Sequence, residues 1–134
     1  MLQLYANSKV QHMRIFILED SQERIKQFNR AFIGHELFIT DNATVAINKL
    51  KSQKFDLIFL DHDLNGLQME WREDNNGLMV AREIPSTKNC DSMTIIHSCN
   101  TPAAIAMKGF LPHAHRISFV MLNLDHLAGQ INGL

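Results

Sequence analysis

The sequence contains few of the features that mark a secreted, disulfide-rich or membrane-spanning protein. Its 134 residues include two cysteines, Cys90 and Cys99, whose separation fits neither a metal-binding motif nor a disulfide framework. It has no apolar run of about 18 residues, the length that a membrane-spanning helix needs. The first residues also lack the basic and apolar regions of a signal peptide. These absences predict a reduced, soluble, cytoplasmic protein that does not interact with a membrane.

The chain also has little excess of charge of either sign. Its formal net charge is -1 at pH 7, so no general electrostatic attraction to nucleic acid or to a membrane surface is expected. Hydrophobic residues make up 46% and charged residues 20% of the sequence, which is typical of a globular domain rather than a disordered chain. We predict a single domain over residues 13–134, preceded by a short leader over 1–12.

Apolar segments alternate with amphipathic ones along the chain. The amphipathic segments predict helices, of which two begin at the N-cap candidates Ser21 and Asn42. Such alternation predicts an α/β fold with three layers, in which a doubly wound, parallel, five-stranded sheet has helices on both faces. A polar loop over 65–76 is long for such a fold and is predicted to be a functional flap. The predicted strands are 13–20, 35–41, 55–64, 92–100 and 116–122, and the helices are 21–33, 42–53, 77–84, 101–111 and 124–134.

Polar side chains gather where three of these predicted strands end. The carboxyl ends of parallel strands meet at one edge of the sheet, and ligands bind outside that edge. We therefore expect the polar residues to form one site, although a single acid at a strand end often only caps the next helix. They are Glu19 and Asp20 at the end of the first strand, Asp61, His62 and Asp63 at the third, and His97, Ser98 and Asn100 at the fourth.

Carboxylates from two strand ends repel one another unless a cation lies between them. Glu19, Asp20 and Asp61 are therefore predicted to bind a divalent metal ion. Mg²⁺ suits such oxygen ligands best, Mn²⁺ and Ca²⁺ come next, and the nearby histidines leave Zn²⁺ as an alternative. In a metal-free alternative, His97 or His62 acts as a general acid or base beside a carboxylate that orients it.

The order of elements and the acids at the strand ends resemble the receiver domain of two-component response regulators. The resemblance implies that Glu19 and Asp20 bind Mg²⁺, that Asp61 accepts a phosphoryl group, and that Ser98 supplies the hydroxyl group found after the fourth strand. It also implies a lysine after the fifth strand, where this sequence has none and Asn123 is the nearest candidate.

Four segments together resemble a narrower family, the cyclic-phosphate processing receiver domain. They are "LEDSQERIKQF", "FDLIFLDHDL", "NNGLMVA" and "IIHSCN". The resemblance implies a receiver fold that binds or hydrolyses a cyclic or terminal phosphate of a nucleotide or an RNA end. The matching positions are Glu19, Asp20, Arg24, Asp61, His62, Asp63, Gly77, His97, Ser98 and Asn100.

For hydrolysis we predict Asp61, Asp63 and His97 as catalytic residues, with Asp63 or Asp61 orienting His97. The phosphate-binding candidates are Arg24, Ser98 and Asn100, and His62 is a further candidate of open role. Structural alternatives remain: an ion pair with the acids for Arg24, an N-cap for Asn100, and a buried backbone contact for His62. Two other functions also remain open, namely a stand-alone receiver phosphorylated on Asp61 and a non-catalytic protein that sequesters a cyclic nucleotide.

Overall fold

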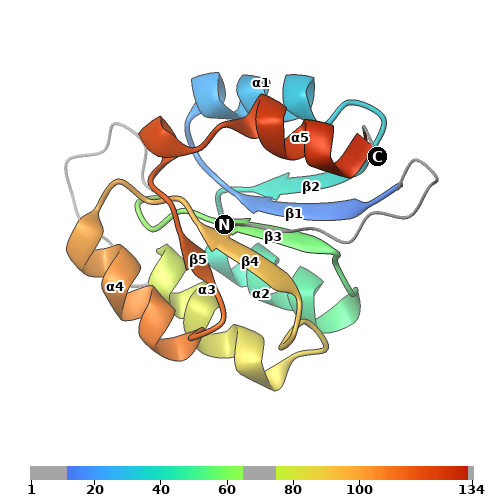
Figure 1. Ribbon diagram of the computed structural model, residues 1–134. Helices are drawn as coiled ribbons and strands as arrows, with labels where there is room; N and C mark the ends of the chain where they lie inside the picture. The colour runs from blue at the N-terminus through green and yellow to red at the C-terminus, as the bar shows by residue number, and fades with distance from the viewer. Residues whose placement is uncertain (1–11, 65–74, 133–134) are drawn as a thin grey trace.

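The computed structural model describes residues 12–64 and 75–132 and contains one parallel sheet of five strands (Figure 1). The predicted leader, apart from residue 12, and most of the predicted flap lie outside the described residues. The strand order is β2-β1-β3-β4-β5, which confirms the predicted doubly wound α/β fold. The strands are β1 (Arg14–Leu18), β2 (Glu36–Thr40), β3 (Leu57–Leu60), β4 (Met93–Ile96) and β5 (His115–Arg116).

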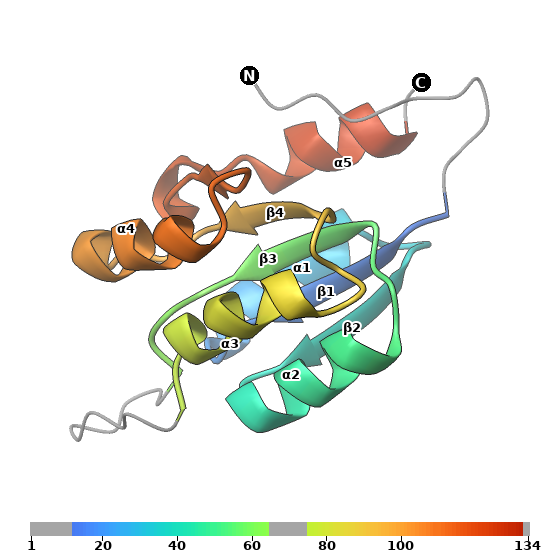
Figure 2. The ribbon, with the colours of Figure 1, turned by 90° about the horizontal axis from the view of Figure 1, so that it is seen from below.

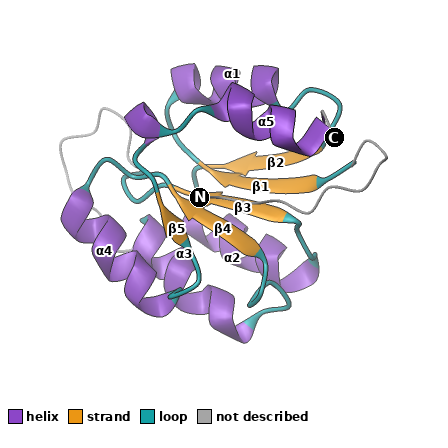
Figure 3. Ribbon diagram, in the orientation of Figure 1, coloured by secondary structure: helices purple, strands orange, loops and turns teal. Residues whose placement is uncertain are grey.

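Figure 3 shows the helices of the chain, and polar side chains fix where four of them begin. Ser21, Asn42, Asn76 and Asn100 each accept a hydrogen bond from a backbone N–H in the first turn of the following helix. Such a bond satisfies one of the donors that a helix end leaves unpaired. The helices are α1 (Gln22–Ala31), α2 (Ala43–Ser52), α3 (Gly77–Glu83), α4 (Thr101–Phe110) and α5 (Leu124–Asn132).

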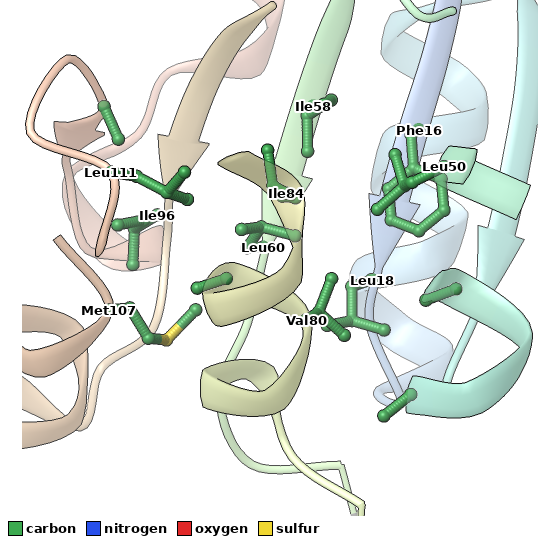
Figure 4. Packing of buried hydrophobic residues seen from close by; sticks show 14 of the residues in the cluster. Phe16, Leu18, Leu50, Ile58, Leu60, Val80, Ile84, Ile96, Met107 and Leu111 are labelled. Carbon is green, nitrogen blue, oxygen red and sulfur yellow. The ribbon is translucent and has the colours of Figure 1, made fainter. Parts of the chain in front are cut away.

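The helices form a layer on each face of the sheet, with α1 and α5 on one face and α2, α3 and α4 on the other (Figures 1 and 2). Successive strand residues point to opposite faces, so each strand contributes to two cores. The core under α2, α3 and α4 includes Phe16, Leu18, Ile58, Leu60 and Ile96 (Figure 4). The core under α1 and α5 includes Ile15, Ile17, Leu57, Phe59 and Ile95.

The fifth strand is shorter than the sequence predicts. The prediction of a strand over 116–122 is wrong beyond Arg116, because the chain turns into a 3-10 helix, η2 (Phe119–Met121). Its backbone still follows β4, since Ile117 N donates to Ile96 O at 3.0 Å and Phe119 N to His97 O at 2.9 Å. Val120 is 79% exposed, so this apolar segment is not a buried strand.

Pro85 ends α3 as predicted, and it lies in a short 3-10 helix, η1 (Ile84–Ser86). Proline removes a backbone donor and clashes with the preceding turn of an α-helix. No helix within the described residues is long and apolar enough to cross a lipid bilayer.

Candidate functional site

Glu19, Asp61 and His97 lie side by side because the register of the sheet aligns the strands that they follow. Leu18 pairs with Leu60, and Leu60 pairs with Ile96, so the next residue of each strand is one of the three. By the alternation of side chains, all three point to the face covered by α1 and α5. They are buried, with exposed fractions of 1%, 5% and 0% in the same order. The predicted gathering of polar strand ends is therefore present on three neighbouring strands.

The carboxylate of Glu19 uses both of its oxygens in hydrogen bonds within this cluster. Its Oε1 lies 2.8 Å from His97 Nε2, and its Oε2 accepts hydrogen bonds from the backbone N–H groups of Asp20 and Ser21, both at 3.1 Å. Asp61 has its own backbone partner, since its Oδ1 accepts a bond from His62 N at 2.8 Å. Glu19 thus joins the buried histidine to the turn that begins α1.

Arg24 supplies the positive charge beside the two acids. Its Nη1 lies 3.8 Å from both Glu19 Oε1 and Asp61 Oδ2, which is the ion-pair arrangement considered for this residue from the sequence. The guanidinium also lies over the Phe119 ring, 4.6 Å from its centroid, and its Nη2 contacts Cys99 Sγ at 3.5 Å. These contacts hold the cation at the mouth of the cluster, where its side chain is 26% exposed.

His97 is enclosed by aromatic rings. The rings of Phe28, Phe59 and Phe119 lie 5.6, 6.2 and 6.0 Å from its ring, measured between centroids. Within the described residues, its Nδ1 is buried without a hydrogen-bond partner. His97 therefore acts on the site through Glu19, because its ring is fully buried and its Nε2 faces that carboxylate.

Burial affects the two acids differently. Burial raises the pKa of Asp61 to about 6, and the negative charge of Glu19 adds to the increase. Burial also disfavours the ionised form of Glu19, but the hydrogen bond and positive charge of His97 outweigh it and hold the pKa of Glu19 below its usual value. Near neutral pH the site thus contains an ionised Glu19 and an Asp61 that is costly to ionise.

We expect the variant Asp61→Asn to be more stable than the wild type at pH 8, by about 1–3 kcal/mol, because it removes a buried carboxylate whose pKa is raised. A raised carboxyl pKa means that the folded state binds the proton more tightly than the unfolded state. The destabilisation of the wild type by the ionised Asp61 is therefore complete above about pH 6, and it disappears as the pH falls towards about 4. Urea unfolding of both proteins between pH 4 and pH 8 measures the difference in their free energies of unfolding. A difference that does not depend on pH would contradict a raised pKa of Asp61.

A second polar group lies beside the buried cluster. Asp63 Oδ1 lies 2.8 Å from His62 Nδ1 and accepts a 3.4 Å bond from Asn100 Nδ2. Asn100 also caps α4, so its predicted structural role is present, and its backbone N–H donates to Ser98 Oγ at 3.0 Å. The Asp63 side chain is 65% exposed and that of His62 is 9% exposed. Asp63 therefore orients His62, whereas Glu19 is the partner of His97.

Gly77 allows the start of α3 to approach the end of β3, where Asp61 of the buried cluster and His62 of the second polar group lie. Its N–H donates to His62 O at 2.9 Å, and a Cβ at this position would overlap with the carbonyl oxygen of Asp61 and lie 2.8 Å from His62 Cα. No side chain other than hydrogen fits this approach of α3 to the end of β3. The sequence indicated Gly77 only through the family resemblance, and it gave no signal for Phe119 or Cys99 as neighbours of Arg24.

Comparison with known families identifies the fold that contains this arrangement. The model of the cyclic-phosphate processing receiver domain matches residues 13–113. The chain belongs to this family. The match includes both polar groups, and it confirms the resemblance noted in the sequence. No curated protein matches this receiver domain significantly.

Solved structures similar to this receiver domain include response regulators, and their low identity shows the fold alone. A CheY-like receiver protein from Methanospirillum hungatei has a TM-score of 0.69 and 17% identity over 90% of this chain and 91% of that chain. The phosphorylated cyanobacterial phytochrome response regulator RcpA has a TM-score of 0.65 and 21% identity, over 92% and 91%. The Mn²⁺-bound response regulator Rcp1 has a TM-score of 0.62 and 21% identity, over 90% of each chain.

The buried cluster of this receiver domain has donors that fit a divalent metal ion. Glu19, Asp61 and His97 can each place one ligand atom within 4.8 Å of the others. A cation there would favour the ionised form of Asp61, which burial and Glu19 now oppose. Two carboxylates and an imidazole suit Mn²⁺ or Zn²⁺. Mg²⁺ would be bound by the carboxylates, and Asp20, which directly follows Glu19, is the predicted third one. The metal role of Asp20 remains a prediction.

Proposed function

We propose that this receiver domain binds and hydrolyses a cyclic or terminal phosphate of a nucleotide or of an RNA end. Hydrolysis of a phosphate ester needs positive charge near the non-bridging oxygens, an activated water molecule and an acid for the leaving oxygen. The edge of the sheet has residue types for each of these needs. The proposal depends on which of these side chains contact one another.

The observation that supports it best is the pair formed by His62 and Asp63. A carboxylate that holds Nδ1 of a histidine at 2.8 Å fixes the orientation of the ring, which is what a general acid or base requires. Transfer of a phosphoryl group to an aspartate does not need such a pair. The Asp63 side chain is 65% exposed, whereas the other candidate site residues are buried or half-buried, so its pair with His62 lies where a ligand would arrive from solvent.

The remaining residues have roles that follow from their charge and position. Arg24 would bind two phosphate oxygens, because a guanidinium has five donors and its contacts with Glu19 and Asp61, at 3.8 Å, are not close hydrogen bonds. Ser98 and Asn100 would donate hydrogen bonds to the same phosphate. A divalent ion at Glu19 and Asp61, when bound, would supply further positive charge for the phosphate oxygens.

Phosphorylation of Asp61 is a second candidate, favoured by the receiver fold and by the position of Asp61 at the end of β3 next to Glu19. The described residues place no lysine against Asp61. The segment after β5 brings Phe119 to the site, and Lys108 donates to the carbonyl groups of Pro112 and Ala114 instead. A third candidate is a protein that binds a cyclic nucleotide without turnover.

The test is hydrolysis of 2′,3′-cyclic, 3′,5′-cyclic and terminal phosphates of nucleotides and short RNAs, with and without Mg²⁺ or Mn²⁺. We expect turnover of at least one class, and a loss on the order of a hundredfold in kcat for His62→Gln and Asp63→Asn. The matched control is Asp91→Asn. Asp91 lies in the loop before β4, where it is exposed and forms an ion pair with Lys54. This variant should therefore retain full activity.

Each alternative has its own result. A labile phosphoryl adduct on Asp61 after treatment with acetyl phosphate and Mg²⁺, without any hydrolysis, would establish the phosphoacceptor. Tight binding of a cyclic nucleotide without turnover would establish the binding protein. Equal activity of Asp63→Asn and the wild type would exclude the role of the His62 and Asp63 pair.

A further inference from the structure

A cavity of about 430 Å³ lies between α1, the η2 turn and the start of α5. Figure 1 shows these two helices side by side on one face of the sheet. The volume falls within the range of pockets that hold small ligands. The side chains relevant to its chemistry are Gln27, Arg30, Val120, Met121, Asn123 and Asp125.

Two of the residues that line the cavity are close along the chain to the site of Arg24, which is the proposed phosphate-binding residue. Gln27 follows Arg24 by three positions on α1, and residues with this spacing are neighbours on a helix surface, about 5–6 Å apart. On the other side, Val120 follows Phe119, whose ring lies under the Arg24 guanidinium. A ligand with its phosphate at Arg24 would therefore reach the cavity past Gln27 on one side and Val120 on the other.

Three polar side chains of the cavity are available to a ligand, whereas Asn123 Oδ1 already accepts a bond from His126 N at 2.9 Å. In the part of the chain that the structure describes, no hydrogen bond or ion pair uses the side chains of Gln27, Arg30 or Asp125. Arg30 supplies donors, Asp125 supplies acceptors and Gln27 supplies both. Val120 and Met121, exposed to 79% and 77%, add an apolar surface.

We infer that this cavity binds the base of a nucleotide whose phosphate lies at Arg24. A nucleobase has donors and acceptors on its edge and an apolar face, and the cavity has a partner for each. A simple phosphate ester would leave these groups unused. The inference extends the proposed function, because it makes the substrate a nucleotide and assigns base recognition to α1 and α5.

The experiment separates the base from the rest of the ligand. Binding is measured by calorimetry for adenosine, guanosine, cytidine and uridine 2′,3′-cyclic phosphates and for the 2′,3′-cyclic phosphate of methyl riboside, which keeps the sugar and phosphate but has no base. We expect at least one nucleotide to bind about tenfold or more tightly than the base-free ligand. Two variants, Gln27→Ala and Asp125→Ala, should each reduce that ratio severalfold, since each removes a hydrogen bond to the base.

Gln53→Ala is the control, because it makes the same change as Gln27→Ala at the end of α2, on the opposite face of the sheet from the cavity. This variant should keep the wild-type ratio. Equal affinities of the nucleotides and the base-free ligand would overturn the inference, as would a ratio that both cavity variants leave unchanged. Hydrolysis observed alongside equal affinities would leave the proposed function intact.

A further measurement distinguishes failure of the proposed function from failure of this inference. If no cyclic phosphate binds, the four free nucleosides are titrated while the backbone amide signals of Gln27 and Asp125 are followed by NMR. Shifts at these amides that saturate would support the base site without the phosphate chemistry. No shift with any nucleoside would overturn the inference.

Discussion

The variant His97→Phe is expected to lower the free energy of unfolding by about 3–5 kcal/mol, because it leaves the buried carboxylate of Glu19 without its closest partner. Phenylalanine fits the surroundings of the ring, since Phe28, Phe59 and Phe119 already enclose it. The loss therefore arises from the unpaired charge rather than from packing. Urea unfolding monitored by circular dichroism measures it.

The control is a second substitution that removes the charge. In the double variant Glu19→Gln with His97→Phe, the glutamine oxygen can still accept the bonds from the backbone N–H groups of Asp20 and Ser21. We expect the double variant to recover more than half of the stability that His97→Phe loses. If both variants are equally unstable, the loss comes from packing, and the electrostatic explanation is incorrect.

The second large effect is expected for Gly77→Ala. The added Cβ would overlap with backbone atoms at the end of β3, and backbone cannot move aside as a flexible side chain can. We expect a loss of about 3 kcal/mol or more in the free energy of unfolding. Any folded fraction should bind the proposed phosphate ligand more weakly, because the shift would displace Asp61 and His62 and break the hydrogen bond from Gly77 N to His62 O.

Gly109→Ala provides the matched comparison. Gly109 lies in α4, and a Cβ there would have no neighbour within 4 Å. Alanine is the better helix former, so this variant should be more stable than the wild type by up to about 1 kcal/mol. Chemical unfolding of the two glycine variants in parallel tests the close approach at Gly77. A similar small effect of both would show that α3 can move away from β3 at low cost.

Much of the fold could be predicted from local patterns in the sequence. Nearly continuous apolar strands require cover on both faces, and this requirement predicts the parallel sheet with its two helical layers. Ser21, Asn42 and Asn100 mark helix starts through bonds to the adjacent backbone, which depend only on nearby residues. The fifth strand was predicted too long, because the apolar residues near Val120 are exposed at the edge of the sheet, where a strand has only one neighbour.

The residues of the candidate site could be predicted from the sequence, but the contacts between their side chains could not. Polar residues at three strand ends had to meet at one edge, because parallel strands end together. The register decided that His97 contacts Glu19, and the bend of the chain after β3 brought His62 to Asp63. Arg24 lies over Phe119 because the chain turns after β5. The sequence by itself thus determined the chemistry available at the edge of the sheet, while the tertiary structure decided the partners, because partner choice depends on contacts between residues far apart in the chain.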